Sequence, residues 1–385
     1  MSGLRVALLY PPPWKIPGPN QAPDPVDGPP EDFDPNDLDA DFFQVPYGLL
    51  SLASQAWRSG HSVKVINLSG LPWAEIERIV SMLDADVVGM SCWTANRRGV
   101  RLVADLVKRS SPSTHVTVGG PHITPLARSF LAHSSNVDSA VVGEGELTFL
   151  ELLERLQSGR SLRGLKGALV RELGSIQQTE SRPTVASLDT LESPHRHFAT
   201  HIVMTSRGCP WACTFCGAES SWGRGFRPFS VERVLDDLEA ALERVKVRIL
   251  LIKDDTFTTN RDRVLKLCRG IRDRKLQFLW SCDTRVDVLR EDLIREMRLA
   301  GCERISLGVE SGSARILKAI NKKISVQQIL DSAETARRYG VRARFFMMLG
   351  NRGETRETFL ETLDFLKRAR PHQYIFSCLS IYPGT

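Results

Sequence analysis

The chain has 385 residues, of which 42% are hydrophobic and 25% charged, a balance typical of a globular protein long enough for two domains. No apolar run approaches the ~20 residues that span a bilayer, which excludes an integral membrane protein and favours a cytoplasmic one. Residues 1–199 carry 18 Lys and Arg against 22 Asp and Glu (net −4), and residues 200–385 carry 33 against 23 (net +10). Acidic residues interrupt the basic ones, which argues against a nucleic-acid surface.

The first 156 residues alternate between strand-like apolar runs and segments with helical periodicity. Strands are predicted at 4–10, 63–68, 87–91, 115–118 and 139–142. Helices are predicted at 49–58, 73–83, 99–108 and 148–156. This alternation predicts a doubly wound parallel sheet, an α/β fold whose ligand crevice lies beyond the carboxyl ends of the strands.

The turns after three of these strands are the candidate ligand site of the first domain. They contain Ser91, Cys92, Trp93 and Thr94; Gly119, Gly120 and His122; and Gly143, Glu144 and Gly145. Paired glycines let the backbone approach a large ligand closely. A nucleotide is one such ligand, but no G-x-G-x-x-G follows the first strand.

Two segments between the predicted elements are less regular. Residues 16–45 are rich in Pro, Asp and Gly, and we expect either a lid over the crevice or a plain solvated insertion. Residues 157–199 are expected to be a linker with a short hairpin that turns at Gly174.

The next feature along the chain is a group of three cysteines within eight residues, Cys209, Cys213 and Cys216. One short loop can direct these three thiolates at an iron–sulfur cube, leaving one of its four irons open. A zinc site would need a fourth ligand and usually two cysteine pairs, and the other cysteines are scattered singly. A disulfide framework is not expected in a large protein with isolated cysteines.

Residues 200–385 are predicted to form a (β/α)₆ barrel that ends at its sixth strand. Strands are predicted at 201–206, 248–253, 277–281, 304–309, 342–349 and 374–381. Helices are predicted at 231–244, 261–274, 290–300 and 327–339. Because chemistry in parallel barrels gathers at the carboxyl ends of the strands, the polar clusters there are candidate site residues. Some of these residues are instead helix caps, and Ser230 and Thr355 are the clearest cases.

The cysteine loop, with Phe215 before its third cysteine, closely resembles that of the radical S-adenosylmethionine (SAM) enzymes. The resemblance implies a [4Fe–4S] cluster on the three cysteines, with its open iron holding the amino and carboxylate groups of SAM. It further implies that an electron from the cluster cleaves SAM to a 5′-deoxyadenosyl radical. The implied SAM contacts are Asp254 and Asp255 (amino end), Arg285, Glu310 and Ser311 (carboxylate and ribose), and Gly350, Glu354 and Phe215 (adenine).

The first domain resembles the cobalamin-binding domain that precedes the barrel in one class of these enzymes. The Gly-Gly-Pro-His turn, the Gly-Glu-Gly-Glu turn and the Pro46-Tyr47-Gly48-Leu49-Leu50 helix start carry the likeness. The implied cobalamin contacts are the ten turn residues named above. No histidine here has an aspartate two residues before it, so a lower cobalt ligand of the Asp-x-His-x-x-Gly type is not expected.

The resemblance as a whole implies a cobalamin-dependent radical SAM methyltransferase. Such an enzyme moves a methyl group through methylcobalamin to an unactivated carbon of a small molecule, and takes electrons from a low-potential flavodoxin or ferredoxin. Two alternatives remain open: an oxidative cyclase or rearrangement enzyme with the same cofactors, and a non-catalytic cobalamin-binding sensor.

Overall fold

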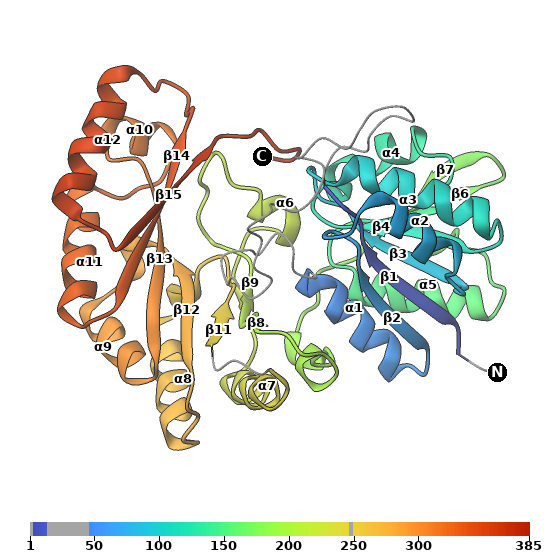
Figure 1. Ribbon diagram of the computed structural model, residues 1–385, viewed down its shortest axis with the longest axis horizontal. Coiled ribbons are helices and arrows are strands. Elements are labelled where there is room, and N and C mark those ends of the chain that lie inside the picture. Colours follow the sequence, from blue (N-terminus) through green and yellow to red (C-terminus); the bar gives the residue numbers. More distant parts are fainter. Residues whose placement is uncertain (1–2, 14–45, 246–248) are drawn as a thin grey trace. The chain divides into compact units, whose positions relative to one another are not determined.

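The computed structural model describes residues 3–13, 46–245 and 249–385. These residues form two compact units, one built mainly from the chain up to Ala186 and the other mainly from residues 195–381 (Figure 1). The insertion at 16–45, for which a lid was one expectation, lies outside the described residues, as does the first residue of the strand expected at 248–253. Along the described part, no helix combines the length and apolar character needed to cross a membrane.

The N-terminal unit is built on a sheet with strand order β2-β1-β3-β4-β5-β6-β7. Its strands are β1 (Arg5–Tyr10), β2 (Ser62–Asn67), β3 (Val87–Ser91), β4 (His115–Gly119), β5 (Ser139–Val141), β6 (Ala168–Glu172) and β7 (Ser175–Gln178). Its helices are α1 (Tyr47–Arg58), α2 (Trp73–Ser81), α3 (Arg97–Ser110), α4 (Ile123–Ala132) and α5 (Glu146–Gln157). Neighbours among β1 to β5 pair in parallel, which confirms the doubly wound α/β sheet.

Apolar side chains on both faces hold this sheet. Helices α2, α3 and α4 share one buried core with the strands, which includes Ile76, Val103 and Ile123. Helix α1 packs against α5. The hairpin expected near Gly174 forms β6 and β7 and extends this sheet, because β6 pairs antiparallel with β5 and β7 pairs antiparallel with β6. Part of the segment assigned to a linker therefore belongs to the sheet, and helix α4 was not anticipated.

The second unit contains six parallel strands in the order β15-β14-β13-β12-β11-β8. Its strands are β8 (Ile202–Val203), β9 (Ser206–Arg207), β10 (Arg227–Pro228), β11 (Ile249–Ile252), β12 (Leu279–Thr284), β13 (Cys302–Glu310), β14 (Arg342–Leu349) and β15 (Gln373–Cys378). Its helices are α6 (Ala218–Trp222), α7 (Val231–Arg244), α8 (Arg261–Asp273), α9 (Glu291–Leu299), α10 (Ala314–Ala319), α11 (Val326–Arg338) and α12 (Arg356–Ala369). The short β9 and β10 pair with each other.

Each strand from β11 to β14 is followed by at least one helix, so the sheet is a partial (β/α)₆ barrel with β8 and β15 as its end strands in the described residues. All carboxyl ends of the six strands therefore lie along one rim. Two helix caps predicted from the sequence are confirmed: the side chain of Ser230 accepts from the Arg233 N–H, and that of Thr355 accepts from the Thr358 N–H.

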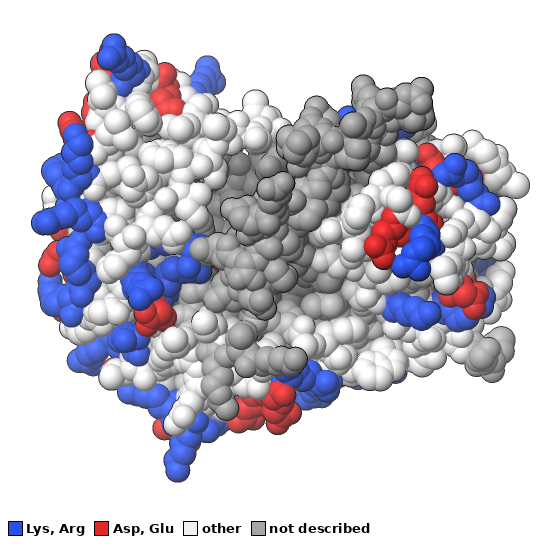
Figure 2. Space-filling view, in the orientation of Figure 1, with Lys and Arg blue, Asp and Glu red and all other residues white. Residues whose placement is uncertain are grey.

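The positive charge of the second unit is spread over its outer helices. Figure 2 shows Lys and Arg side chains along the face of the molecule that α11 and α12 form. Several of them pair with acidic neighbours, such as Arg338 with Glu291 at 3.0 Å and Lys367 with Asp364 at 3.1 Å. These pairs neutralise part of this charge locally.

We predict that Trp280→Ala destabilises the barrel unit by about 3–5 kcal/mol. Trp280 is 1% exposed, contacts Phe257 edge to face at 5.6 Å and donates from its indole N–H to the Ala300 carbonyl at 2.8 Å. Urea unfolding followed by circular dichroism measures the loss. Leu279→Ala, at an exposed position on the same strand, is the matched control, and an equal loss in both variants would contradict the prediction.

Candidate active site

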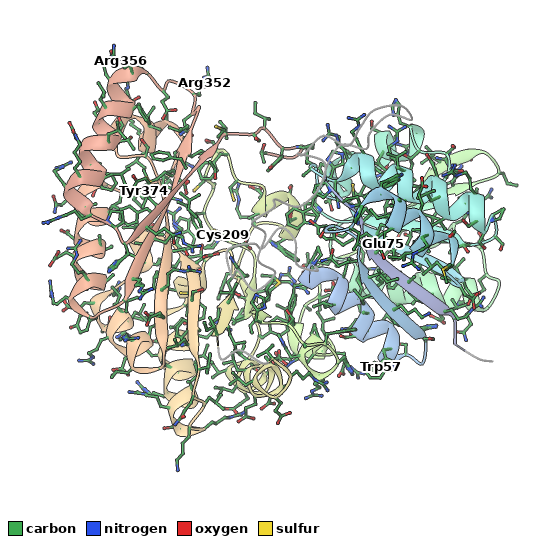
Figure 3. All side chains as sticks on the ribbon, viewed as in Figure 1. Trp57, Glu75, Cys209, Arg352, Arg356 and Tyr374 are labelled. Carbon is green, nitrogen blue, oxygen red and sulfur yellow. The ribbon has the colours of Figure 1, made fainter. Side chains whose placement is uncertain are left out.

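The cysteine loop begins where the chain leaves β9, at the carboxyl rim of the barrel; Figure 3 labels Cys209 at its start. Gly208 makes the entry turn with φ = +83°, and a Cβ there would lie 2.5 Å from the Gly225 carbonyl oxygen. Only glycine fits this position without displacing backbone. Cys209 and Cys213 are half-buried, and Cys216 is exposed.

The paired aspartates after β11 fix the segment that leads into the loop. The buried Asp254 carboxylate accepts backbone N–H bonds from Thr205 (2.6 Å) and Ser206 (3.1 Å). It also accepts hydroxyl bonds from the same two residues at 2.5 and 2.6 Å. Asp255 accepts the N–H of Gly208 at 3.1 Å. The two carboxylates therefore hold the last residues before the first cysteine.

Arg263, on α8, also holds the segment before the loop through hydrogen bonds to Thr205. Its guanidinium donates to the Thr205 carbonyl at 2.6 Å and to the Thr205 hydroxyl at 3.2 Å. Burial raises the pKa of Asp254, and the positive charge of Arg263 opposes that rise. Asp254 was expected to contact the amino end of SAM; with four donors already on its carboxylate, that contact stays a prediction.

The far end of the loop is attached to the turn that follows α10. The N–H of Thr214 donates to the Ile320 carbonyl at 3.1 Å, and the Asn321 side-chain amide donates to the Ala212 carbonyl at 2.6 Å. Phe215 packs against the small apolar cluster of Ile316, Ile320 and Met348. The loop is thus held at both ends by segments that are distant in sequence.

Arg285, after β12, reaches the middle of the loop. Its Nη1 lies 3.2 Å from the Cys213 sulfur, and its guanidinium lies 4.8 Å from the centre of the Trp211 ring. Nε and Nη2 donate to both carboxylate oxygens of Asp287 at 2.9 and 3.0 Å, and Nη2 also donates to the Lys322 carbonyl at 2.6 Å. The expected contact with a SAM carboxylate stays a prediction, because these partners already occupy most of the donors.

Glu310, at the end of β13, forms a buried ion pair with Lys322 at 2.8 Å. Its backbone has φ = +68°, which is unusual for a residue other than glycine. The Lys322 ammonium also lies 5.6 Å from the centre of the Phe215 ring, so this pair is adjacent to the cysteine loop. Sequence reasoning missed Lys322 and Asn321, because a polar turn between two helices carries no local signal of function.

The remaining rim residues organise their own turns. The Ser311 hydroxyl lies 3.2 Å from that of Thr362 and accepts the Ser313 N–H at 3.1 Å. Glu354 accepts the N–H of Gly350 at 2.5 Å, and Gly350 has φ = +86°. These residues lie on the predicted rim, and their contacts with SAM stay predictions.

The three thiols fit an iron–sulfur cluster. The surrounding protein raises the pKa of Cys216, and negative charge at Asp255, Cys209 and Cys213 adds to that rise, so the three sulfurs share one neighbourhood. In the described residues no three His, Cys, Asp or Glu side chains are gathered for a single metal ion. A [4Fe–4S] cube binds each of three cysteines on a different iron, and this loop supplies three.

In the N-terminal unit, the turns after β3 and β4 are joined. The N–H of His122 donates to the Cys92 carbonyl at 3.1 Å, and the His122 Nδ1 lies 3.1 Å from the Thr94 hydroxyl. Burial and the nearby Arg97 lower the pKa of His122, which favours a neutral ring. Gly120 has φ = +107°, and a Cβ there would lie 2.9 Å from the Cys92 carbonyl oxygen. Cys92 is fully buried, so its thiol is not open to a ligand.

The turn after β5 adjoins the turn after β4. The N–H of Gly143 donates to the Thr124 hydroxyl at 3.2 Å, which in turn donates to the Gly120 carbonyl. Glu144 accepts the N–H of Val185 at 2.7 Å. The turns after β4 and β5 thus carry four glycines, Gly119, Gly120, Gly143 and Gly145, and Trp93 in the turn after β3 is 44% exposed. Cobalamin binding at these turns, including the contacts expected of Ser91, Gly119 and Gly145, stays a prediction.

Two family models match the chain. The radical SAM superfamily matches residues 203–366, and the B12-binding domain matches residues 38–153. The two matches coincide with the barrel unit and with most of the N-terminal unit.

Individual proteins are similar over most of the chain. An uncharacterised methyltransferase of Pyrococcus horikoshii is 33% identical over 88% of this chain and 77% of its own length. The anaerobic magnesium-protoporphyrin IX monomethyl ester cyclase of Rubrivivax gelatinosus is 24% identical over 80% of this chain, which spans only 59% of the cyclase.

Among solved structures, this chain is similar to the radical SAM methyltransferase TsrM of Kitasatospora setae, which was solved with cobalamin and a [4Fe–4S] cluster bound. The match covers 100% of this chain and 77% of the TsrM chain. Its TM-score is 0.77 at 17% identity, so this likeness concerns the fold. The family models and the Pyrococcus relative decide the family: the chain belongs to the B12-binding radical SAM enzymes.

Proposed function

We propose that this protein is a cobalamin-dependent radical SAM methyltransferase that transfers a methyl group to an unactivated carbon of a small molecule. The observation that carries the proposal is the three-cysteine loop, attached at both ends to the carboxyl rim of the barrel, in one chain with a B12-binding domain. Methyltransferase relatives support it. When bound, the cluster, SAM and cobalamin would supply the one-electron and methyl-carrying chemistry.

The residues of this chain would bind and orient these groups. Cys209, Cys213 and Cys216 would hold the cluster. Asp254 would act as a positioning residue, because its carboxylate holds Thr205 and Ser206 ahead of the loop. Lys322 would offer a positive charge to the SAM carboxylate, since it lies beside Phe215 at the loop.

The adenine and ribose of SAM would lie along the rest of the rim. The bare backbone of Gly350 permits close approach of a flat base, and Glu310 and Ser311 can accept hydrogen bonds from ribose hydroxyls. Electrons would come from a low-potential flavodoxin or ferredoxin.

A second candidate function keeps the same cofactors but transfers no methyl group. The Rubrivivax cyclase, similar over 80% of this chain, favours it. The two candidates differ in their products: methyl transfer from SAM leaves S-adenosylhomocysteine, and radical cleavage leaves 5′-deoxyadenosine.

We predict that the protein, reconstituted anaerobically with iron, sulfide and cobalamin and given SAM and a strong reductant, forms both products. Mass spectrometry quantifies them. Deoxyadenosine without S-adenosylhomocysteine would favour the cyclase alternative. If neither product forms although cluster and cobalamin are shown to be bound, both candidates are contradicted.

Cys213→Ala is expected to lose most of the bound iron and to reduce 5′-deoxyadenosine formation at least 100-fold, because two thiolates cannot replace three. Iron content, the cluster absorbance and product assays measure this. Cys378→Ala is the matched control, since Cys378 is an exposed thiol on β15, and it should retain both. Full iron content in Cys213→Ala would show that the cluster is held elsewhere.

Gly120→Ala is expected to weaken cobalamin binding about tenfold, or about 1.4 kcal/mol. The new Cβ would press on the Cys92 carbonyl and shift the crevice floor. Equilibrium dialysis with hydroxocobalamin measures the affinity. The control is Gly174→Ala, which also has a positive φ but has open space around it on the β6–β7 hairpin. If both variants bind like the unaltered protein, the crevice is not the cobalamin site.

A further inference from the structure

Arg285 makes a contact that binding of SAM does not require: its positively charged guanidinium donates a hydrogen bond to the Cys213 sulfur. We propose that Arg285 is a positioning residue that sets the reduction potential of the iron–sulfur cluster through this hydrogen bond. The inference rests on the proposed function, because it needs a cluster on the three cysteines.

The guanidinium is held firmly in this place. It is 4% exposed, and three of its neighbours fix it from different sides: Asp287 through two parallel bonds, the Lys322 carbonyl and the face of the Trp211 ring. A guanidinium with a paired carboxylate has a defined orientation, which a lysine ammonium would lack. The Nη1–H therefore remains directed at the Cys213 sulfur, at 3.2 Å.

The effect on potential follows from the charge. Reduction adds one electron to the cluster and so increases the negative charge on its ligating sulfurs. A nearby positive charge and a hydrogen bond to sulfur both stabilise the reduced form, which raises the reduction potential. Because Arg285 is shielded from solvent, its charge is screened less than a surface charge would be.

Asp287 limits this effect. Its carboxylate pairs with the same guanidinium, so part of the positive charge that the cluster would experience is neutralised. Other charges near the loop are Asp255, which affects Cys216, and the Lys322–Glu310 pair. Removing the Asp287 charge should therefore shift the potential in the direction opposite to removing Arg285.

The test is an anaerobic redox titration of the full-length reconstituted protein with dithionite, without SAM, followed by electron paramagnetic resonance of the one-electron-reduced cluster. We expect Arg285→Met to lower the equilibrium constant for reduction at least tenfold, a shift of about 59 mV to more negative potential. Asp287→Asn should shift the potential to more positive values. Arg285→Lys, which keeps the charge but loses the paired donors, should fall between Arg285→Met and the unaltered protein.

Arg263→Met is the matched control. Arg263 is also a buried arginine that holds the segment before the loop, but its hydrogen bonds go to Thr205 and the Phe229 carbonyl and to no cysteine. An equal negative shift in Arg263→Met would overturn the inference, because loosening of the loop would then explain the result. An unchanged potential in Arg285→Met at full iron content would also overturn it.

Two further outcomes separate this inference from the proposed function. If Arg285→Met loses its cluster, the other two variants still test the inference. The reduction potential should then move to more negative values in Arg285→Lys and to more positive values in Asp287→Asn. Shifts in the same direction in both variants would overturn the inference. An unaltered protein that binds no cluster would refute the proposed function, and this inference with it.

Discussion

The Asp254 carboxylate is the interaction on which the barrel rim depends. Two consecutive residues, Thr205 and Ser206, direct both their N–H groups and both their hydroxyls at it. These bonds hold the chain where it passes from β8 to β9, directly before it enters the cysteine loop. A buried carboxylate without its donors would be costly, so the burial of Asp254 depends on these four hydrogen bonds.

The two units hold the residues of their candidate sites in place in different ways. In the N-terminal unit, the turns after the strands contain glycines in place of side chains, and hydrogen bonds such as that between His122 and Thr94 connect neighbouring turns. In the barrel unit, charged side chains such as Asp254, Arg263 and Arg285 hold the cysteine loop and the segment before it through hydrogen bonds. A large flat ligand needs open backbone, whereas a small charged one needs fixed polar groups.

The sequence supported the fold well because the strands are short apolar runs in parallel sheets, which have a clear periodic signal. Strand β14 and helix α7 have the bounds expected, and the cysteine loop was identified from its spacing, its context and its resemblance to the loop of a known family. Helix α4 was missed because it begins directly after the Gly-Gly-Pro-His turn, with a proline, Pro125, in its first turn. The pairing of β6 with β5 was missed because a hairpin has no local signal of the sheet it joins.

The site was predicted less completely. The rim residues lie where expected, because carboxyl ends of parallel strands share an edge. Their hydrogen-bond partners could not be predicted: Asp254 and Arg285 each depend on contacts with residues about 50 to 70 positions away. Lys322 and Asn321 were missed altogether, since their importance comes from tertiary contacts with the cysteine loop.

The left-handed backbone of Glu310 has a consequence for protein engineering. This backbone conformation costs about 1–2 kcal/mol for a residue with a Cβ atom, and a glycine at this position would avoid that cost. Methods that choose residues by backbone preference alone would therefore select glycine here. That choice would leave the Lys322 ammonium buried beside Phe215 without its carboxylate, so the more relaxed backbone would come with an unpaired charge at the rim.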